Sequence, residues 1–199
     1  MNIVFRLLII VGLIYSCTPK PAENQEKIIS KKESSFNPTN YGKPISTISI
    51  LSYPTAEEAK DSGSEAIVGV SINDADKFIH NIIDADEIVL NDKKVQLIID
   101  YPLKKSVIYK FENDKGFSRK DLILAIQEKY KEIYKIEEET AIIKTIPVNN
   151  REGLLNRNET DGKFGIWGHD LSDLYLTDIE VYKDNKGLVS LVLYIESYN

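Results

Sequence analysis

The sequence predicts an α+β domain, with an antiparallel sheet built from hairpins and with one long amphipathic helix and one short helix packed on a face. Two patterns carry this prediction. Residues 174–182 and 188–194 are alternating apolar runs joined by the polar turn 183–187, which is typical of a β-hairpin. Residues 118–138 place apolar side chains at helical spacing, which indicates one long helix.

The elements before the long helix are short. Residues 45–53 and 66–72 are rich in Ile and Val and are predicted as strands, and residues 75–83 are predicted as the short helix. Two further apolar runs are separated by three polar residues, which is hairpin spacing, and one more strand follows them. These three runs are residues 87–91, 95–101 and 107–111.

The long helix has a clear start and an unusual end. Ser118, with Asp121 three residues later, resembles a capping box. The apolar stripe consists of Leu122, Ile123, Ile126, Tyr130, Ile133 and Tyr134. Residues 137–139 are all Glu, where the helix dipole is already negative. We expect either a solvated terminus or a bound cation or basic partner group there.

Composition excludes several classes of protein. The chain has 199 residues, a net charge of -6 and 42% hydrophobic residues, which are ordinary values for a globular domain. Its negative charge argues against nucleic acid as the main ligand. One Cys excludes an internal disulfide framework, and with two His we expect no metal site and no cofactor.

The amino terminus is predicted to be an export signal. Arg6 precedes an apolar run that is shorter than the roughly 20 residues needed to span a bilayer. The sequence Leu-Ile-Tyr-Ser-Cys at 13–17 resembles the lipobox of bacterial lipoproteins. This resemblance implies a signal peptide over residues 1–16 and lipidation of Cys17, as by palmitate. An ordinary secretory signal with an incidental Cys is the alternative.

Residues 17–44 are predicted to be the lipidated Cys and a flexible tether, because four of the seven prolines lie there among polar residues. Residues 45–199 are then one globular domain. The implied location is the bacterial cell envelope, with the lipid on Cys17 as the membrane partner. Thr18 stands where some bacterial lipoproteins carry an Asp retention signal. The resemblance to that family therefore implies the outer membrane, because the signal is missing.

Residues 149–173 form the least regular segment, with four Gly and the only Trp. A long ordered loop of this kind is where binding residues concentrate. The candidate binding residues are Asn156, Arg157, Asp161, Trp167, His169, Asp170 and Asp173. Residues 156–162 look like a calcium loop, but their Gly is at the seventh position instead of the sixth and the first ligand is Asn, so we expect a polar turn, with calcium binding as the alternative.

The carboxyl-terminal block resembles a group of uncharacterised bacterial proteins. The residues that carry this resemblance are Leu-Asn-Arg at 155–157 and Gly-Ile-Trp-Gly-His-Asp-Leu-Ser-Asp-Leu at 165–174. It covers roughly residues 117–199 and implies a shared fold, not a reaction. Some relatives in that group are similar to immunity-type or envelope-associated proteins.

We expect a lipid-anchored binding module with an unknown protein or envelope ligand, and no enzymatic activity, because Gly-x-Ser-x-Gly and similar signatures are missing. An immunity protein against a basic toxin is one form that suits an acidic domain. Two other functions stay open. One is an envelope hydrolase that uses His169 with Asp170 or Asp173. The other is a structural envelope lipoprotein with no discrete ligand. For His169 and Asp170 themselves, hydrogen bonds to the loop's own backbone are the more economical expectation.

Overall fold

The computed structural model describes residues 27–28, 43–55, 58–60, 63–152 and 156–197. The predicted signal peptide, Cys17 and most of the predicted tether lie outside these residues. Lys27–Ile28, within the predicted tether, form the short strand β1. A mixed α/β fold with mostly antiparallel strands and few helices is observed, which confirms the coarse fold prediction.

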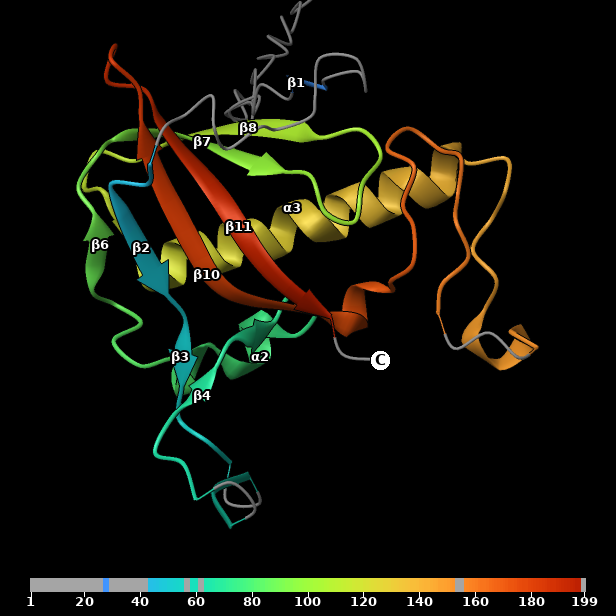
Figure 1. The fold of residues 1–199 in the computed structure, drawn as a ribbon, viewed down its shortest axis with the longest axis horizontal. Helices are drawn as coiled ribbons and strands as arrows, with labels where there is room; N and C mark the ends of the chain where they lie inside the picture. The colour runs from blue at the N-terminus through green and yellow to red at the C-terminus, as the bar shows by residue number, and fades with distance from the viewer. Residues whose placement is uncertain (1–26, 29–42, 56–57, 61–62, 153–155, 198–199) are drawn as a thin grey trace, which may run out of the picture.

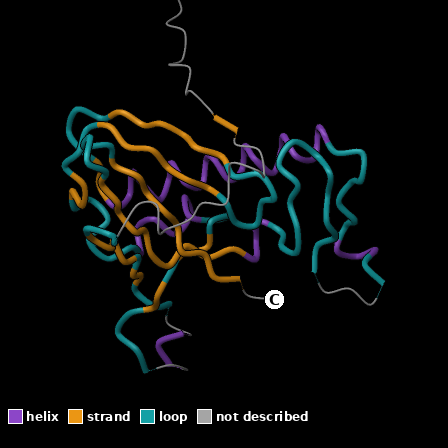
Figure 2. Tube along the Cα trace, turned by 45° about the horizontal axis from the view of Figure 1, so that its top comes forward, coloured by secondary structure: helices purple, strands orange, loops and turns teal. Residues whose placement is uncertain are grey.

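One main sheet dominates the molecule (Figures 1 and 2). Its strands, in spatial order, are β1 (Lys27–Ile28), β8 (Val107–Glu112), β7 (Lys94–Ile99), β11 (Val189–Ser197), β10 (Leu174–Lys183) and β2 (Ser46–Ser49). The strand β5 (Val70–Ser71) pairs with the first part of β10, beyond the end of β2. Two small sheets join β3 (Leu51–Ser52) to β4 (Ile67–Val68) and β6 (Ile88–Leu90) to β9 (Phe117–Ser118).

The carboxyl-terminal hairpin is confirmed. β10 and β11 pair antiparallel from the Lys183–Val189 partners to the Leu174–Ser197 partners. In the turn, the Asp184 side chain accepts backbone hydrogen bonds from Lys186 and Leu188, both at 2.8 Å. Gly187 has a φ of 83°, a left-handed conformation that favours glycine.

The hairpin predicted for residues 87–101 is wrong. β6 pairs with β9, whereas β7 lies between β8 and β11 and runs parallel to β11. The last five residues of β7 are all buried, so its near-continuous apolar run reflects a central strand covered on both faces. The sheet is therefore mixed and not wholly antiparallel.

The helix α3 (Arg119–Thr140) has 22 residues and lies behind β10 and β11 in Figure 1. Its predicted capping box is confirmed, since Asp121 N–H donates to Ser118 Oγ at 3.1 Å and Ser118 N–H donates to the Asp121 carboxylate at 3.0 Å. The buried residues of α3 include Gln127, Lys129 and Glu137. Its amphipathic character is therefore not confirmed, because polar side chains interrupt the buried stripe.

The short helix is shorter than predicted. α2 (Ala75–Phe78) passes directly into the 3-10 helix η2 (Ile79–Asn81), where residues 75–83 were expected to form one helix. Ile82 already has extended backbone angles, and Ile83 N–H bonds to Leu51 O at 2.8 Å. Pairing with the β3 backbone thus ends the helix early.

The core lies between the main sheet and α3. Its largest fully buried side chains come from the sheet, from α3 and from the long loop. They are Tyr109, Tyr130, Phe164, Ile50, Ile72, Leu97, Ile99, Ile123, Ile126, Ile133, Ile166 and Leu174. Phe164 and Ile166 belong to the segment predicted as a binding loop, so part of that loop is core.

Candidate functional site

The candidate site is a projection beyond the end of α3, drawn in orange at the right of Figure 1. Extended pieces of residues 156–169 pair with each other and with residues 102–105. Arg157 is bridged antiparallel to Gly168, and Leu103 to Ile166. Trp167 N–H also donates to Pro102 O at 3.1 Å. The loop therefore has a defined backbone over these residues.

Glu137 fixes this loop from beneath. Its side chain is fully buried at the end of α3. One carboxylate oxygen accepts from Thr160 Oγ1 at 2.7 Å and Gly162 N–H at 2.8 Å. The other accepts from the N–H groups of Phe164 and Gly165 at 2.8 and 3.1 Å. The expectation of a solvated glutamate terminus is wrong for this residue, because the loop folds its own N–H donors around it.

The electrostatics of Glu137 follow from these contacts. Burial by itself raises the pKa of its carboxyl, but the hydrogen bonds from Thr160 and from the loop N–H groups outweigh burial. The net result is a pKa below the ordinary value of 4.5. The negative charge is therefore retained in the folded protein, where the donors of the loop stabilise it.

The loop glycines are explained by the same contacts. A Cβ built on Gly162 would lie 2.6 Å from Glu137 O and 2.7 Å from the Glu137 carboxylate. Gly165 has a φ of 70°, a backbone conformation that disfavours other residues. The signal was present in the sequence as a glycine-rich loop following a glutamate-rich helix end, but only the tertiary contact links the two.

Below the loop surface, two arginines share one carboxylate. Arg151 donates hydrogen bonds from Nη1 and Nη2 to the two Asp170 carboxylate oxygens, at 2.6 and 3.0 Å. Arg157 Nε lies 3.7 Å from the same carboxylate. The side chains of both arginines are 3% exposed, whereas that of Asp170 is 25% exposed. The hydrogen bonds from Arg151 hold its pKa above the ordinary value.

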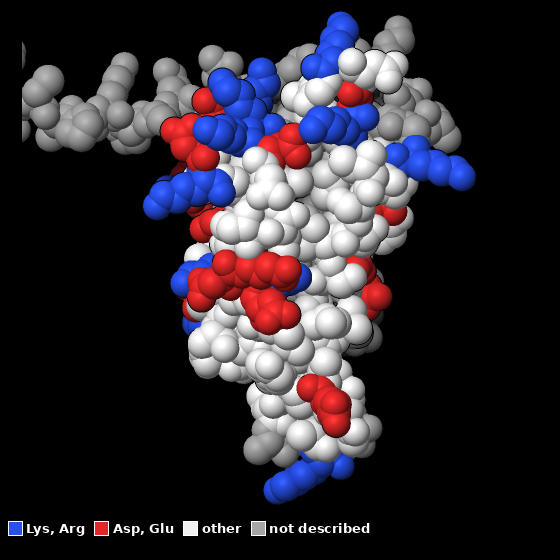
Figure 3. Space-filling model, turned by 90° about the vertical axis from the view of Figure 1, so that its left-hand side faces the viewer, with Lys and Arg blue, Asp and Glu red and all other residues white. Residues whose placement is uncertain are grey.

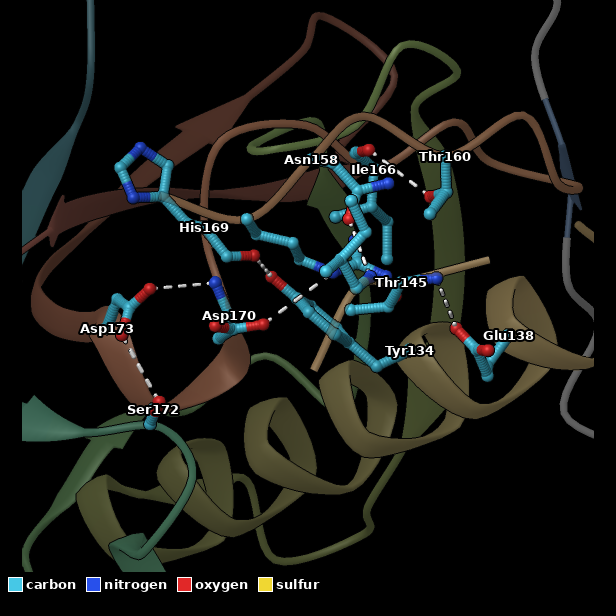
Figure 4. Close-up of polar contacts among 12 residues, drawn as sticks. Tyr134, Glu138, Thr145, Asn158, Thr160, Ile166, His169, Asp170, Ser172 and Asp173 are labelled. Carbon is cyan, nitrogen blue, oxygen red and sulfur yellow. Dashed lines mark hydrogen bonds and ion pairs between the residues drawn. The ribbon is translucent and has the colours of Figure 1, made fainter. Parts of the chain in front are cut away.

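Arg157 also contacts a residue of α3 and a residue of the segment that follows α3. Its guanidinium lies 5.3 Å from the centre of the Tyr134 ring and donates through Nη2 to Thr145 Oγ1. Tyr134 OH in turn donates to His169 O at 2.9 Å (Figure 4). Burial raises the pKa of the Tyr134 hydroxyl, which stays a neutral donor. Arg157 Nη1 has no hydrogen-bond partner among the described residues.

Tyr101, Trp167 and His169 form an aromatic cluster. The Trp167 ring stands edge-on to the Tyr101 ring at 5.4 Å, and His169 lies 5.6 Å from Tyr101 and 6.1 Å from Trp167. Trp167 is 40% exposed and His169 only 8%. Tyr101 was not among the predicted site residues, because it follows a strand far away in the sequence.

His169 does not bond either predicted acidic partner in the described structure. The Asp170 carboxylate is taken by the arginines, and the Asp173 carboxylate accepts from Asp170 N–H at 2.8 Å and Ser172 Oγ at 3.2 Å. Figure 4 shows the His169 ring turned away from Asp170. Its Nδ1 atom is buried and has no partner within the described part of the chain.

The remaining predicted residues lie apart from this cluster. Asp161 accepts backbone hydrogen bonds from Ile142 and Ile143 at 2.9 and 2.7 Å, so it joins the loop to the segment after α3. Asn156 is exposed. Asn158, which was not predicted, joins the same two segments by accepting from Ile146 N–H at 2.7 Å.

Asp100, beside Tyr101, carries a second perturbed carboxyl. Burial raises its pKa above the ordinary value of 3.8, and hydrogen bonds from the N–H groups of Asp100 and Tyr101 only partly oppose this. Folding therefore favours the protonated form of Asp100. Its contribution to the free energy of unfolding is complete below pH 3.8 and is lost as the pH rises through the folded pKa. An ionised Asp100 weakens the fold at neutral pH.

Replacing Asp100 by Asn is therefore expected to stabilise the protein. The expected gain in the free energy of unfolding at pH 7 is roughly 0.5–2 kcal/mol, the usual range for a single stabilising change. The gain should disappear below pH 3.8, where both states of the wild-type carboxyl are protonated. Urea unfolding at pH 7 and at pH 3 measures both values, and an Asn variant less stable at pH 7 would contradict the prediction.

Two global properties complete the description. Among the described residues, no three His, Cys, Asp or Glu side chains come together as they would around a metal ion. No described helix is both long and apolar enough to cross a membrane.

Comparison of the chain with protein-family models, curated proteins and solved structures found no match. Its own fold and site therefore define the class: a mixed α/β fold with mostly antiparallel strands, whose projecting loop carries an exposed Trp and a buried arginine–aspartate cluster.

Proposed function

We propose that this chain is a lipid-anchored binding module of the bacterial envelope and that its contact surface is centred on Trp167. The observation that carries the proposal is the exposure of Trp167 on a backbone that is already ordered. Its N–H is bonded to Pro102 and its ring packs against Tyr101, yet 40% of the residue remains exposed. Rigid aromatic side chains of this kind are frequent energetic centres of protein interfaces.

Neighbouring apolar residues support a larger contact surface. Ile142, Ile146 and Val148 are 88, 37 and 67% exposed on the same projection. Apolar side chains gathered outside a core mark interaction sites more often than chance. The membrane anchor depends on Cys17, and the partner would be a protein or another envelope ligand. A toxin with a basic surface, as for an immunity protein, suits the net charge of -6.

Affinity capture tests the contact surface. The full chain, purified in a non-ionic detergent, is used as bait for envelope and secreted fractions of the native organism. Trp167→Ala is expected to lower the affinity for the captured partner by about 30-fold, since loss of a central aromatic residue costs about 2 kcal/mol or more of binding free energy. The measurement is quantitative mass spectrometry, followed by titration of the purified partner.

The control is Tyr194→Ala, which removes a similarly exposed aromatic side chain (52%) from β11. This variant should capture the partner as well as the wild type does. Equal loss in both variants would show a general effect of surface aromatics, and equal capture by all three proteins would reject the Trp167 surface.

A hydrolase remains a second candidate because His169 Nδ1 is buried and without a hydrogen-bond partner in the described residues. A ligand group reaching Nδ1 would satisfy that atom. This candidate requires His169→Ala to fold normally and to lose turnover on envelope substrates, whereas the binding module requires no turnover from the wild-type chain.

A further inference from the structure

A second candidate site lies on the opposite part of the fold from the α3 end, where β3, β4, β5 and the α2–η2 helices meet. It is a pocket of ≈ 380 Å³. This volume lies within the range of about 300–1,000 Å³ that is usual for small-molecule sites. The pocket is lined by Ser52, Tyr53, Thr55, Glu58, Ile67, Val68, Gly69, Val70, Ser71, Phe78, Asn81 and Tyr175.

The walls of this pocket are built by fixed backbone pairs. Tyr53 N–H donates to Asn81 O at 2.8 Å, and Ser52 is bridged to Ile82, so β3 is held to the end of η2 on one side. β4 pairs with the other side of β3. Gly69 turns the chain from β4 into β5 with a φ of 91°, and a Cβ there would lie 3.2 Å from Leu176 O. These backbone contacts set the positions of the pocket walls.

The lining is rich in exposed aromatic and aliphatic surface. Tyr53, Val68 and Phe78 are 59, 55 and 43% exposed, although each is a large apolar residue that burial would stabilise. Tyr175 adds a third aromatic ring. Figure 3 shows that the part of the molecule around β3 and β4 carries few charged side chains compared with the part above it. An apolar body is the group that this surface accepts best.

The charge of the lining is one-sided. Glu58 is the one carboxylic acid among the described lining residues, and that lining contains no Lys, Arg or His. Glu58 accepts a hydrogen bond from Thr55 N–H at 2.8 Å. Hydrogen bonds from the backbone and side chain of Thr55 lower the pKa of its carboxyl, which is therefore ionised at neutral pH. An acid is repelled from such a pocket and a cation is attracted.

We propose that this pocket binds an organic ammonium ion with an apolar body. Tyr53, Phe78 and Tyr175 contribute three aromatic rings to the lining, and the Glu58 carboxylate supplies the opposite charge. The faces of aromatic rings attract ammonium groups. Aromatic rings combined with one carboxylate distinguish an ammonium ion from a neutral ligand of the same shape. The proposal does not depend on the Trp167 surface, which is formed by other residues.

The test is an NMR titration of the full chain, labelled with ¹⁵N and purified in a non-ionic detergent. The probes are benzyltrimethylammonium chloride, benzyl alcohol and sodium benzoate. The ammonium ion is expected to shift the amide signals of Gly69, Val70 and Ser71 saturably. Benzyl alcohol should bind about three- to tenfold more weakly, and benzoate more weakly still.

Two variants locate the interaction. Glu58→Gln should lower the affinity for the ammonium ion about three- to tenfold and leave the affinity for benzyl alcohol unchanged, because only the charge is removed. Phe78→Ala should lower both affinities. Glu65→Gln removes an exposed carboxylate near the pocket that does not line it, and should change neither.

Three outcomes would overturn the proposal. The first is the absence of saturable shifts with the ammonium ion. The second is equal affinity for the ammonium ion and benzyl alcohol, which would identify a neutral apolar site. The third is an equal effect of Glu58→Gln and Glu65→Gln, which would assign the preference to the general field of an acidic protein.

Discussion

Replacing Glu137 by Ala is expected to lower the free energy of unfolding by more than about 4 kcal/mol, because each buried donor left without an acceptor costs about 1–3 kcal/mol. These donors are the N–H groups of Gly162, Phe164 and Gly165. Thr160 Oγ1 also loses its bond to Glu137 but keeps Ile166 O as an acceptor at 3.2 Å. Glu137→Gln keeps the shape and one acceptor oxygen, so its loss should be smaller, about 1–3 kcal/mol. Urea unfolding followed by circular dichroism gives both values.

The pH dependence separates the charge of Glu137 from its shape. The folded pKa of this carboxyl is below 4.5, so its stabilising contribution is complete above pH 4.5 and is lost as pH falls through the folded value. Gln has no such titration. The difference in stability between the wild type and Glu137→Gln should therefore be largest at neutral pH and should narrow in acid.

The matched control is Glu139→Ala, two residues further along α3. Glu139 is exposed and its partner Lys135 lies 3.9 Å away, so the loss should stay within about 0.5 kcal/mol. If Glu137→Ala lowered the free energy of unfolding no more than Glu139→Ala does, the stability of the loop would not depend on the buried carboxylate. If the Ala variant does not fold, the Gln variant and its pH dependence still decide the question.

Asp170→Asn is expected to cost about 3 kcal/mol, the lower end of the range for removing one partner from a buried ion pair. The change leaves Arg151 and Arg157, each with a side chain 3% exposed, without the carboxylate that they share. Asn also lacks the second acceptor oxygen that the bidentate Arg151 contact uses. The lower end of the range applies because Asp170 itself is 25% exposed.

Chemical unfolding at pH 7 measures this loss. Glu159→Gln is the control, because it removes a carboxylate from an exposed pair with Lys104 on the same loop and should cost at most about 1 kcal/mol. Equal losses in the free energy of unfolding for the two substitutions would mean that burial of the arginines does not increase the cost of removing their partner. A second variant, Asp170→Glu, should recover part of the loss by retaining the charge.

Local signals predicted the long helix and the last hairpin. Ser118 and Asp121 cap α3 as expected, and the turn around Asp184 and Gly187 joins β10 to β11 as expected. Both features depend on side chains within a few residues of the backbone groups that they bond. Such short-range patterns are visible in the sequence because no distant segment is needed to complete them.

The pairing of β7 was not predictable in the same way. Its apolar run fits a hairpin with residues 87–91 as well as it fits a central strand. In the folded protein β7 pairs with β11 on one side and with β8 on the other, and the local sequence of β7 does not specify either partner. Strand pairing between distant segments depends on the whole arrangement of the core, which the local pattern does not contain.

Five of the predicted binding residues share the projecting loop. Arg157, Trp167, His169, Asp170 and Asp173 lie together, as a shared loop implies. Their roles were not predicted, because most of the partners of these residues come from other elements. Tyr101 follows β7, Tyr134 lies on α3 and Thr145 follows α3. Arg151 lies within residues 149–173 but was not among the predicted binding residues.

The sequence by itself determined the class of fold, the extent of α3, the carboxyl-terminal hairpin and the segment that carries the exposed Trp. These follow from periodicity and from contacts between near neighbours along the chain. The tertiary structure alone decided that Glu137 is a buried acceptor, that two arginines share Asp170, and that β3, β4 and α2 enclose a pocket. Each of these arrangements joins residues far apart in the chain, and folding alone brings them within hydrogen-bonding or packing distance.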